Sequence, residues 1–268
     1  MLDSVVCRQA HFETDWYREW ETRLDIGPKG GQPTYHRKPW EFAAVAQTLR
    51  ERGKLHAGMR GLGFAVGTEP LPALFAAHDV EVVATDLAPS DLRKTDWART
   101  NQHSDSTADL YRPDIVDPER FKKLVRFEYA DMNGKWPWPE GSFDFVWSCC
   151  AFEHTGSLEK GVRFVLRSSK LLKPGGIGVH TTEYNCSSND KTVRKGEAVI
   201  YRRRDIEDLD RRLRIENRAC LAKPDFWPGD GEHDRNYDTP PYFTSGKQHI
   251  KFDFWHHVCT SMLLTVIN

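Results

Sequence analysis

The stretch that decides the fold is GLGFAVGTEPLPALFAAHDVEVVATD, residues 61–86. Its first residues, 61–67, combine apolar side chains with three glycines, as expected for a short strand that runs into a tight turn. Pro70 begins a segment to His78 that predicts a helix, because proline is favoured in the first helical turn. The apolar run from Val80 ends in an acid, Asp86, and predicts a second strand. This order predicts a strand–helix–strand unit with parallel strands.

The same alternation continues downstream. Residues 125–129, 143–149 and 177–182 predict three further strands. Residues 158–171 predict a helix, which a Lys-Pro-Gly-Gly sequence ends, and the polar stretch 90–123 is prone to form helix. Strands that alternate with helices in this way predict an α/β fold with a largely parallel sheet.

The two ends of the chain show other patterns. Residues 12–24 and 40–52 predict helices, whereas 250–254 and 259–267 predict two final strands, the last strongly apolar. We therefore expect an N-terminal helical extension or lid, residues 1–58, followed by a single main domain, residues 59–268.

Composition narrows the class of protein. The 268 residues carry 38 basic and 39 acidic side chains, a net charge of −1, and the mean hydropathy is −0.64. Because nucleic-acid binders usually need a basic excess, this balance argues against a nucleic-acid partner. No apolar run approaches the roughly 20 residues that cross a bilayer, and the N-terminal segment lacks a secretory signal pattern. Six cysteines without a C-x-x-C pair predict reduced thiols and a cytoplasmic protein.

The glycine turn and the acid that ends the next strand point to a ligand. Glycines between a strand and a helix let the backbone approach a bound molecule, and Asp86 is placed to accept hydrogen bonds from ribose hydroxyls. Ala65 stands where a third glycine of the common dinucleotide pattern would be expected. Taken alone, the turn is compatible with a nicotinamide cofactor, with a nucleotide, or with a tight turn that binds nothing.

Three downstream motifs are more specific. They are Asp131-Met132 after the third strand, the strand sequence FDFVWS at 143–148, and the sequence LLKPGG at 171–176. In this order and spacing the chain resembles class I S-adenosylmethionine-dependent methyltransferases over about residues 59–185. The resemblance implies a Rossmann-like fold with a mostly parallel seven-stranded sheet, helices on both faces and S-adenosylmethionine as the cofactor.

The resemblance also implies roles for single residues. Gly63 and Gly67 would line the methionine part of the cofactor, Asp86 would bind the ribose, and Asp131 would face the adenine amino group beside Met132. Ser148 would lie near the methyl donor at the carboxyl end of the fourth strand. The full set of cofactor-binding residues that we expect is Gly61, Gly63, Ala65, Gly67, Glu69, Asp86, Leu87, Asp131, Met132, Ser148, Arg37 and Trp40.

The chain departs from the family pattern at Gly61, where an acid usually opens the glycine turn. Glu69 is placed to supply the missing carboxylate for the cofactor's ammonium group, or it is simply an acid that stabilises a helix start. The segment 36–41, HRKPWE, is either a lid whose Arg37 or Lys38 meets the cofactor's carboxylate, or an ordinary helix start.

Methyl transfer to a hydroxyl needs a base near the carboxyl ends of the fourth and fifth strands. His154 is the preferred base because an imidazole titrates near neutral pH, and His180 comes second, with a buried core histidine as the alternative. The catalytic set that we expect is His154, His180, Glu153 and Glu183. With His249, these side chains offer oxygen and nitrogen ligands for a divalent metal, but their spacing fits no compact metal motif, so a metal is not favoured.

The acceptor is the least determined part of this interpretation. We expect an O-methyltransferase acting on a sugar, a glycan or a similar polar acceptor, with residues 226–243 as a possible acceptor wall rich in aromatic and acidic side chains. The run Arg202–Arg204 either meets an anionic acceptor or forms a solvated face. A small-molecule N- or C-methyltransferase of natural-product metabolism and a non-catalytic cofactor-binding module remain alternatives, and the oligomeric state stays open.

Overall fold

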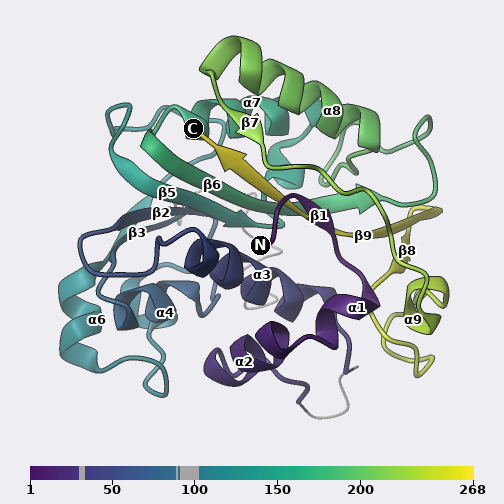
Figure 1. Ribbon diagram of the computed structural model, residues 1–268, viewed down its shortest axis with the longest axis horizontal. Helices are drawn as coiled ribbons and strands as arrows, with labels where there is room; N and C mark the ends of the chain where they lie inside the picture. Colours follow the sequence, from purple (N-terminus) through teal and green to yellow (C-terminus); the bar gives the residue numbers. More distant parts are fainter. Residues whose placement is uncertain (30–33, 89, 91–102) are drawn as a thin grey trace.

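The computed structural model describes residues 1–29, 34–88, 90 and 103–268, and its centre is a twisted sheet (Figure 1). Within these residues the sheet has nine strands, in the order β1-β9-β6-β5-β2-β3-β4, with β7 and β8 also paired to β9. The strands are β1 (Val5–Val6), β2 (Arg60–Phe64), β3 (Glu81–Asp86), β4 (Val125–Tyr129), β5 (Phe143–Cys149), β6 (Leu172–Asn185), β7 (Cys220–Leu221), β8 (Phe252–Phe254) and β9 (His257–Ile267).

Five strands, β4, β3, β2, β5 and β6, form the parallel part of the sheet. The chain begins this part in the middle, at β2, and builds outward to β4 before it returns through β5 and β6. β9 then runs antiparallel to β6 along its whole length, from Asn185 opposite Cys259 to Ile177 opposite Ile267. The expected α/β, Rossmann-like class is therefore confirmed.

The expected count of seven strands needs a correction at one edge of the sheet. The position beyond β9 is shared by three short strands, and each pairs with a different part of β9. β7 pairs with Val266 and Ile267, β1 with Met262 and Leu263, and β8 with the segment 257–259. Six long strands and one divided position thus replace the seven continuous strands that we expected.

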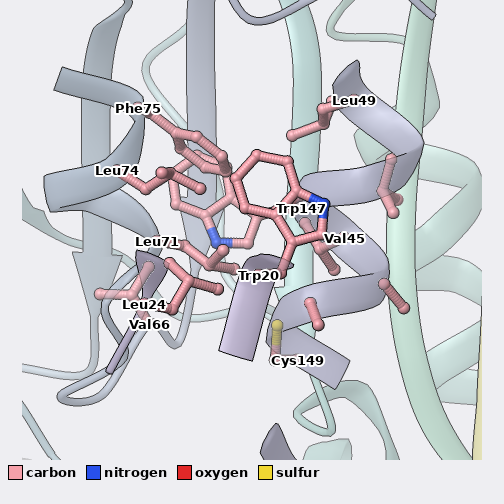
Figure 2. Close-up of a cluster of buried hydrophobic side chains, with 14 of the residues drawn as sticks. Trp20, Leu24, Val45, Leu49, Val66, Leu71, Leu74, Phe75, Trp147 and Cys149 are labelled. Carbon is pink, nitrogen blue, oxygen red and sulfur yellow. The ribbon is translucent and has the colours of Figure 1, made fainter. Parts of the chain in front are cut away.

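Helices cover both faces of the sheet (Figure 1). On one face, α2, α3, α4 and α6 pack over a core that includes Trp20 and Trp147 (Figure 2). Trp40 belongs to the same core. On the other face, α7 and α8 pack over a second core that includes Phe64 and Phe164. The helices are α1 (Gln9–Phe12), α2 (Asp15–Arg23), α3 (Arg37–Glu51), α4 (Leu71–Ala77), α6 (Pro118–Leu124), α7 (Leu158–Ser169), α8 (Arg203–Arg212) and α9 (Glu232–Arg235).

Local sequence explains where several of these helices begin. The Ser157 side chain caps α7 by accepting a hydrogen bond from the backbone N–H of Lys160, and Asp117 caps α6 in the same way. The part of the helix-prone stretch at 91–102 lies outside the described residues, and the remainder forms α6 and a short 3₁₀ turn, Thr107–Leu110. Within the described residues, no helix combines the length and apolar character needed to cross a membrane.

Candidate functional site

A cavity of about 580 Å³ opens where β2, β3, β4 and β5 end at their carboxyl termini. Open α/β sheets bind ligands at this edge, where the loops that follow neighbouring strands diverge. The wall of the cavity is formed by His36, Arg37, Lys38, Phe42, Ala65, Val66, Gly67, Thr68, Glu69, Asp86, Leu87, His103, Ala130, Asp131, Met132, Asn133, Cys149, Cys150, Ala151, His154, Thr155, Phe243 and His249.

The turn after β2 brings its backbone to the cavity. Ala65 and Gly67 both have positive φ, 49° and 51°, so the chain reverses within three residues. The N–H of Gly67 donates to the carboxylate of Asp86 at 3.1 Å, and this bond ties the turn to the end of β3. The expected glycine turn and the expected acid therefore meet at one wall of the cavity.

Gly61 and Gly63 have a different role from the cofactor contact expected for them. Neither lines the cavity. A Cβ atom on Gly61 would lie 2.4 Å from the ring of Phe145, and one on Gly63 would lie 2.3 Å from the ring of Trp147. These positions need glycine because the aromatic side chains of β5 lie directly against the backbone of β2.

Asp86 is buried and held in place by several donors. Its carboxylate accepts the N–H of Leu87 at 2.8 Å, and Nδ1 of His103 lies 3.3 Å away. Burial raises the pKa of Asp86, although these partners favour its ionised form. The backbone N–H of Ser104 also donates to this carboxylate, at 3.4 Å, so protein donors surround Asp86 at the wall of the cavity.

Asp131 and Met132 follow β4 and line the same cavity beside Asp86. The Asp131 carboxylate accepts the N–H of Asn133 at 2.9 Å, while its backbone carbonyl accepts the indole N–H of Trp136. The side chain of Met132 is almost fully buried. Thus Asp131 and Met132 place an acid and a soft apolar side chain at the end of β4, one strand beyond Asp86 and two strands from the glycine turn after β2.

Glu69 brings a buried carboxyl group to the cavity from the start of α4. Its Oε1 accepts a hydrogen bond of 2.5 Å from the indole N–H of Trp147. Burial raises the pKa of Glu69 to about 8, more than this hydrogen bond lowers it. A cationic group bound in the cavity would offset that burial penalty.

The start of α3 brings basic side chains to the cavity, and one of them forms a buried ion-pair network. Arg37 lies 3.0 Å from Glu41 and 2.5 Å from Glu183, so it joins α3 to β6. Lys38 lies 3.4 Å from the same Glu41 and is about one-third exposed. We expected Trp40 to contact the cofactor. Instead, its side chain is fully buried against His11 and does not line the cavity.

His154 is the one member of the expected catalytic set that lines the cavity. Its Nδ1 lies 2.9 Å from the backbone carbonyl of Glu197, which places the proton on Nδ1 and leaves Nε2 as an acceptor. Burial lowers the pKa of His154 to about 4, so the imidazole is neutral at physiological pH. A neutral imidazole at this position is able to accept a proton.

His180 lies in the core instead. Its Nδ1 is 2.9 Å from the hydroxyl of Ser148, and its ring packs edge-on against Phe152 and Phe164. Burial lowers the pKa of His180 to about 3. Neither Ser148 nor His180 lines the cavity, so this pair fits the buried core histidine that was the alternative.

Glu153 and Glu183 lie beneath the cavity, next to Cys150. Single ligand atoms of these three residues lie within 4.8 Å of one another, and within the described residues they form the one group with metal-ligand spacing. Burial raises the pKa of both carboxyl groups to about 7. Arg37 already pairs with Glu183 and lies 3.4 Å from the Cys150 sulfur, so a guanidinium stands where a metal ion would bind.

Sequence patterns did not predict several residues of the cavity wall, and His249 is the most informative of them. The sequence suggests His249 only as a metal ligand, and the loop that holds it follows no periodic pattern that would place it at the cavity. Of the expected acceptor wall, residues 226–243, only Phe243 lines the cavity. In the run Arg202–Arg204, Arg202 is buried and pairs with Asp205, whereas Arg203 and Arg204 are exposed and pair with Glu207 and Asp190, so the solvated-face alternative fits these two alone.

Comparison with known proteins gives one match to a family model. Residues 61–180 match the family model described as a methyltransferase domain. No curated protein sequence matches the chain. Among solved structures, the [4+2]-cyclase SpnF is 16% identical with a TM-score of 0.47, and 100% of this chain covers 98% of that one.

Two further structures are S-adenosylmethionine-dependent methyltransferases. The enzyme from Mesorhizobium loti is 15% identical with a TM-score of 0.45, over 83% of this chain and 96% of that one. Phosphoethanolamine N-methyltransferase 2 of Haemonchus contortus is 17% identical with a TM-score of 0.42, over 73% of this chain and 40% of that one. The chain spans between 40% and 60% of the length of several structures that it matches.

Proposed function

We propose, from the premise that residues 61–180 form a class I S-adenosylmethionine-dependent methyltransferase domain, that this protein transfers the methyl group to a hydroxyl of a small polar acceptor. One observation carries the proposal. A single cavity brings together the glycine turn, Asp86, Asp131 and His154 at the carboxyl edge of the sheet.

The residues of the cavity fit the chemistry of the cofactor. Asp86 is a hydroxyl acceptor beside the backbone of Gly67, and Asp131 with Met132 offers an acceptor and a soft apolar surface for a purine. Glu69, buried with a raised pKa, would hold the ammonium group. Lys38, about one-third exposed, would meet the carboxylate. When bound, S-adenosylmethionine supplies an electrophilic methyl group on a positively charged sulfur.

The protein's own residues then have two tasks. The cavity wall excludes water and holds the acceptor in line with the methyl group. This positioning accelerates the transfer, because the reacting atoms are already aligned when they meet. Nε2 of His154 takes the proton that the hydroxyl gives up as its oxygen bonds to carbon. The imidazolium that forms lies 3.9 Å from Glu153, whose carboxylate form would stabilise it.

Calorimetry with S-adenosylhomocysteine, the demethylated cofactor, tests the cofactor half of the proposal. We expect Asp86→Asn to weaken binding by about tenfold to a hundredfold, because a charged hydrogen-bond partner is lost. Asp79→Asn is the matched control, since Asp79 lies in the turn before β3 and does not line the cavity. Absence of binding to the unmodified protein would defeat every methyltransferase interpretation, and equal loss in both variants would defeat the role of Asp86.

Transfer of a radiolabelled methyl group to a panel of simple alcohols, phenols, glycosides and amines tests the acceptor half. We expect His154→Gln to slow methylation of hydroxyls by about 10²-fold or more, because it removes the proton acceptor. Methylation of amines alone, at a rate indifferent to this variant, would instead favour an N-methyltransferase. Cofactor binding with no transfer to any member would favour a non-catalytic module.

A further inference from the structure

Six residues of the cavity wall lie outside the segment that matches the methyltransferase domain. They come from the start of α3 and from the segment between β7 and β9, and they are His36, Arg37, Lys38, Phe42, Phe243 and His249. Apart from Lys38, the residues assigned to the cofactor come from the shared segment. The part of the wall that the other five build is therefore where an acceptor particular to this chain would be recognised.

Four aromatic rings gather at this part of the wall, and three of them, His36, Phe243 and His249, line the cavity. The ring of His249 stacks on His36, with centroids 5.0 Å apart and planes at 25°, and on Phe252 at 5.1 Å and 24°. Phe243 tilts against the same imidazole at 4.5 Å. A backbone bridge between His36 and His249 fixes the two histidines beside each other, although more than 200 positions separate them in the chain.

A single buried carboxylate orients this group of rings. Asp238 is fully buried, and it lies 2.9 Å from Nδ1 of His249 and accepts the backbone N–H of Phe243 at 3.0 Å. It also accepts from the N–H of Thr239 and the hydroxyl of Ser245. Since an ionised carboxylate only accepts, Nδ1 of His249 carries the proton and Nε2 is left as an acceptor.

The backbone of Phe243 is strained, as expected for a residue whose position matters to a site. Its φ of 65° lies in the left-handed region, which a bulky side chain rarely adopts, and the hydrogen bond to Asp238 holds it there. Its side chain is 54% exposed although it lines the cavity. One face of the phenyl ring is therefore open to a ligand.

We propose that the rings of His36, Phe243 and His249 form the acceptor subsite and that it takes a flat, unsaturated ring bearing hydroxyl groups, in preference to a saturated sugar. The proposal rests on the proposed function and names its acceptor class. The acceptor ring stacks on the exposed ring of Phe243, since His249 already stacks on His36 and Phe252. A saturated ring cannot make this interaction in the same way. Nε2 of His249 accepts a hydrogen bond from a polar substituent of that ring.

Two probes with the same pattern of hydroxyl groups separate ring stacking from hydrogen bonding: resorcinol and cyclohexane-1,3-diol. Both are titrated, with methyl α-D-glucoside, into protein that is labelled with ¹⁵N in its histidines and saturated with S-adenosylhomocysteine. We expect resorcinol to bind about fivefold more tightly than the saturated diol, with a shift of the Nε2 resonance of His249. Equal affinities, tighter binding of the glucoside, or no binding of resorcinol would overturn the proposal.

A pair of variants locates the binding. Phe243→Leu should reduce resorcinol affinity to that of the saturated diol and leave the diol unchanged. Trp227→Leu is the matched control, because Trp227 is also 54% exposed and lies in the same part of the chain but does not line the cavity. Identical effects of the two variants would overturn the proposal. If S-adenosylhomocysteine itself does not bind, the proposed function fails, whereas binding without preference for resorcinol defeats the acceptor class alone.

Discussion

At the scale of single residues, the most informative group is the carboxyl of Glu69. It faces the cavity and lies against the indole of Trp147, in surroundings that raise its pKa to about 8. A carboxyl held in this state is mostly protonated at neutral pH. If it binds the ammonium group of the cofactor, it must lose that proton first, so binding and pH are coupled.

We therefore expect the affinity for S-adenosylhomocysteine to rise as the pH increases from 6.5 to 8.5. Below the pKa of Glu69, each pH unit should change affinity by up to about tenfold, because one proton is released on binding. Glu69→Gln should bind more weakly at pH 8.5 and show no such slope in calorimetry. Glu81→Gln, at an exposed position at the start of β3, serves as the control. A slope that persists in Glu69→Gln would assign the coupling to another group.

At the scale of elements, β2 and β5 lie so close together that side chains of β5 cover the backbone of β2. Gly63 lies beneath Trp147 and Val66, whose atoms leave no space for a methyl group. We expect Gly63→Ala to lower the free energy of unfolding by about 1–3 kcal/mol, measured by urea denaturation. Gly27→Ala should change it by less than about 0.5 kcal/mol, since its added methyl group would meet only the Glu21 side chain at an ordinary distance.

The junction between α3 and β6 depends on Arg37. Its guanidinium is nearly buried between Glu41 and Glu183, and its removal would leave the buried Glu183 without its cation, whereas Glu41 keeps Lys38. We expect Arg37→Met to cost about 3 kcal/mol of stability or more. Arg50→Met, on the same helix but one-third exposed, should cost less than about 1 kcal/mol.

A double variant separates the effect of charge from that of packing in the Arg37→Met protein. The double variant Arg37→Met with Glu183→Gln should regain part of the lost stability, because the unpaired charge is gone. If the double variant is as unstable as the sum of its parts, the loss is due to packing and not to charge.

Sequence patterns located the long elements more reliably than the short ones. β4 and β5 occupy the residues predicted for them. β5 is buried throughout, as its mostly apolar sequence predicts for a parallel strand, whereas β4 lies at the edge of the sheet and is only partly buried. β1 has only two residues, and its partner lies more than 250 positions away, so no local pattern marks it. β6 extends beyond the predicted 177–182 because its pairing with β9 continues to Asn185.

The same distinction applies to the cavity. Asp86 and Asp131 were predicted because they end or follow strands, and strand ends meet at one edge of the sheet. Phe243 and His249 reach the cavity through Asp238, a hydrogen-bonded contact in a loop without regular pattern. Cys150 has a φ of 42° at the end of β5, and an apolar run gives no sign of such a turn. Contacts of this kind depend on tertiary structure, and a single sequence does not encode them locally.

At the scale of the whole molecule, two sets of buried titratable groups have opposite effects on how stability changes with pH. Five buried histidines have pKa values lowered to about 3 or 4, and three buried carboxyl groups have pKa values raised to about 7 or 8. The histidines cost stability as the pH falls below 6.5, because only the unfolded chain then takes up protons. The carboxyl groups cost stability as the pH rises, because only the folded chain then retains protons.

In the acid range the histidines outnumber the carboxyl groups, so the free energy of unfolding should rise with pH. Above neutrality the histidines are neutral in both states and the carboxyl groups alone act, so it should fall. We expect a maximum near roughly pH 6.5 in urea denaturation curves measured from pH 5 to 8.5. His180→Asn should flatten the acid side of this profile, and Glu153→Gln the alkaline side. A stability that rises steadily up to pH 8.5 would show that the carboxyl groups are ionised in the folded protein.

The shared outer edge of β9 has a consequence for how the protein is made. Val5 and Val6 find their partners on β9 only after more than 250 further residues have been joined to the chain. At about 5–20 residues per second, this takes on the order of 10–50 seconds on the ribosome. During that time the parallel strands β2 to β5 have their neighbours, whereas β1 and β7 lack β9; before β9 is made, the partner that β1 has is the segment around Asp225. The sheet is therefore completed only once β9 has emerged, and the N-terminal strand that is synthesised first is among the last to pair.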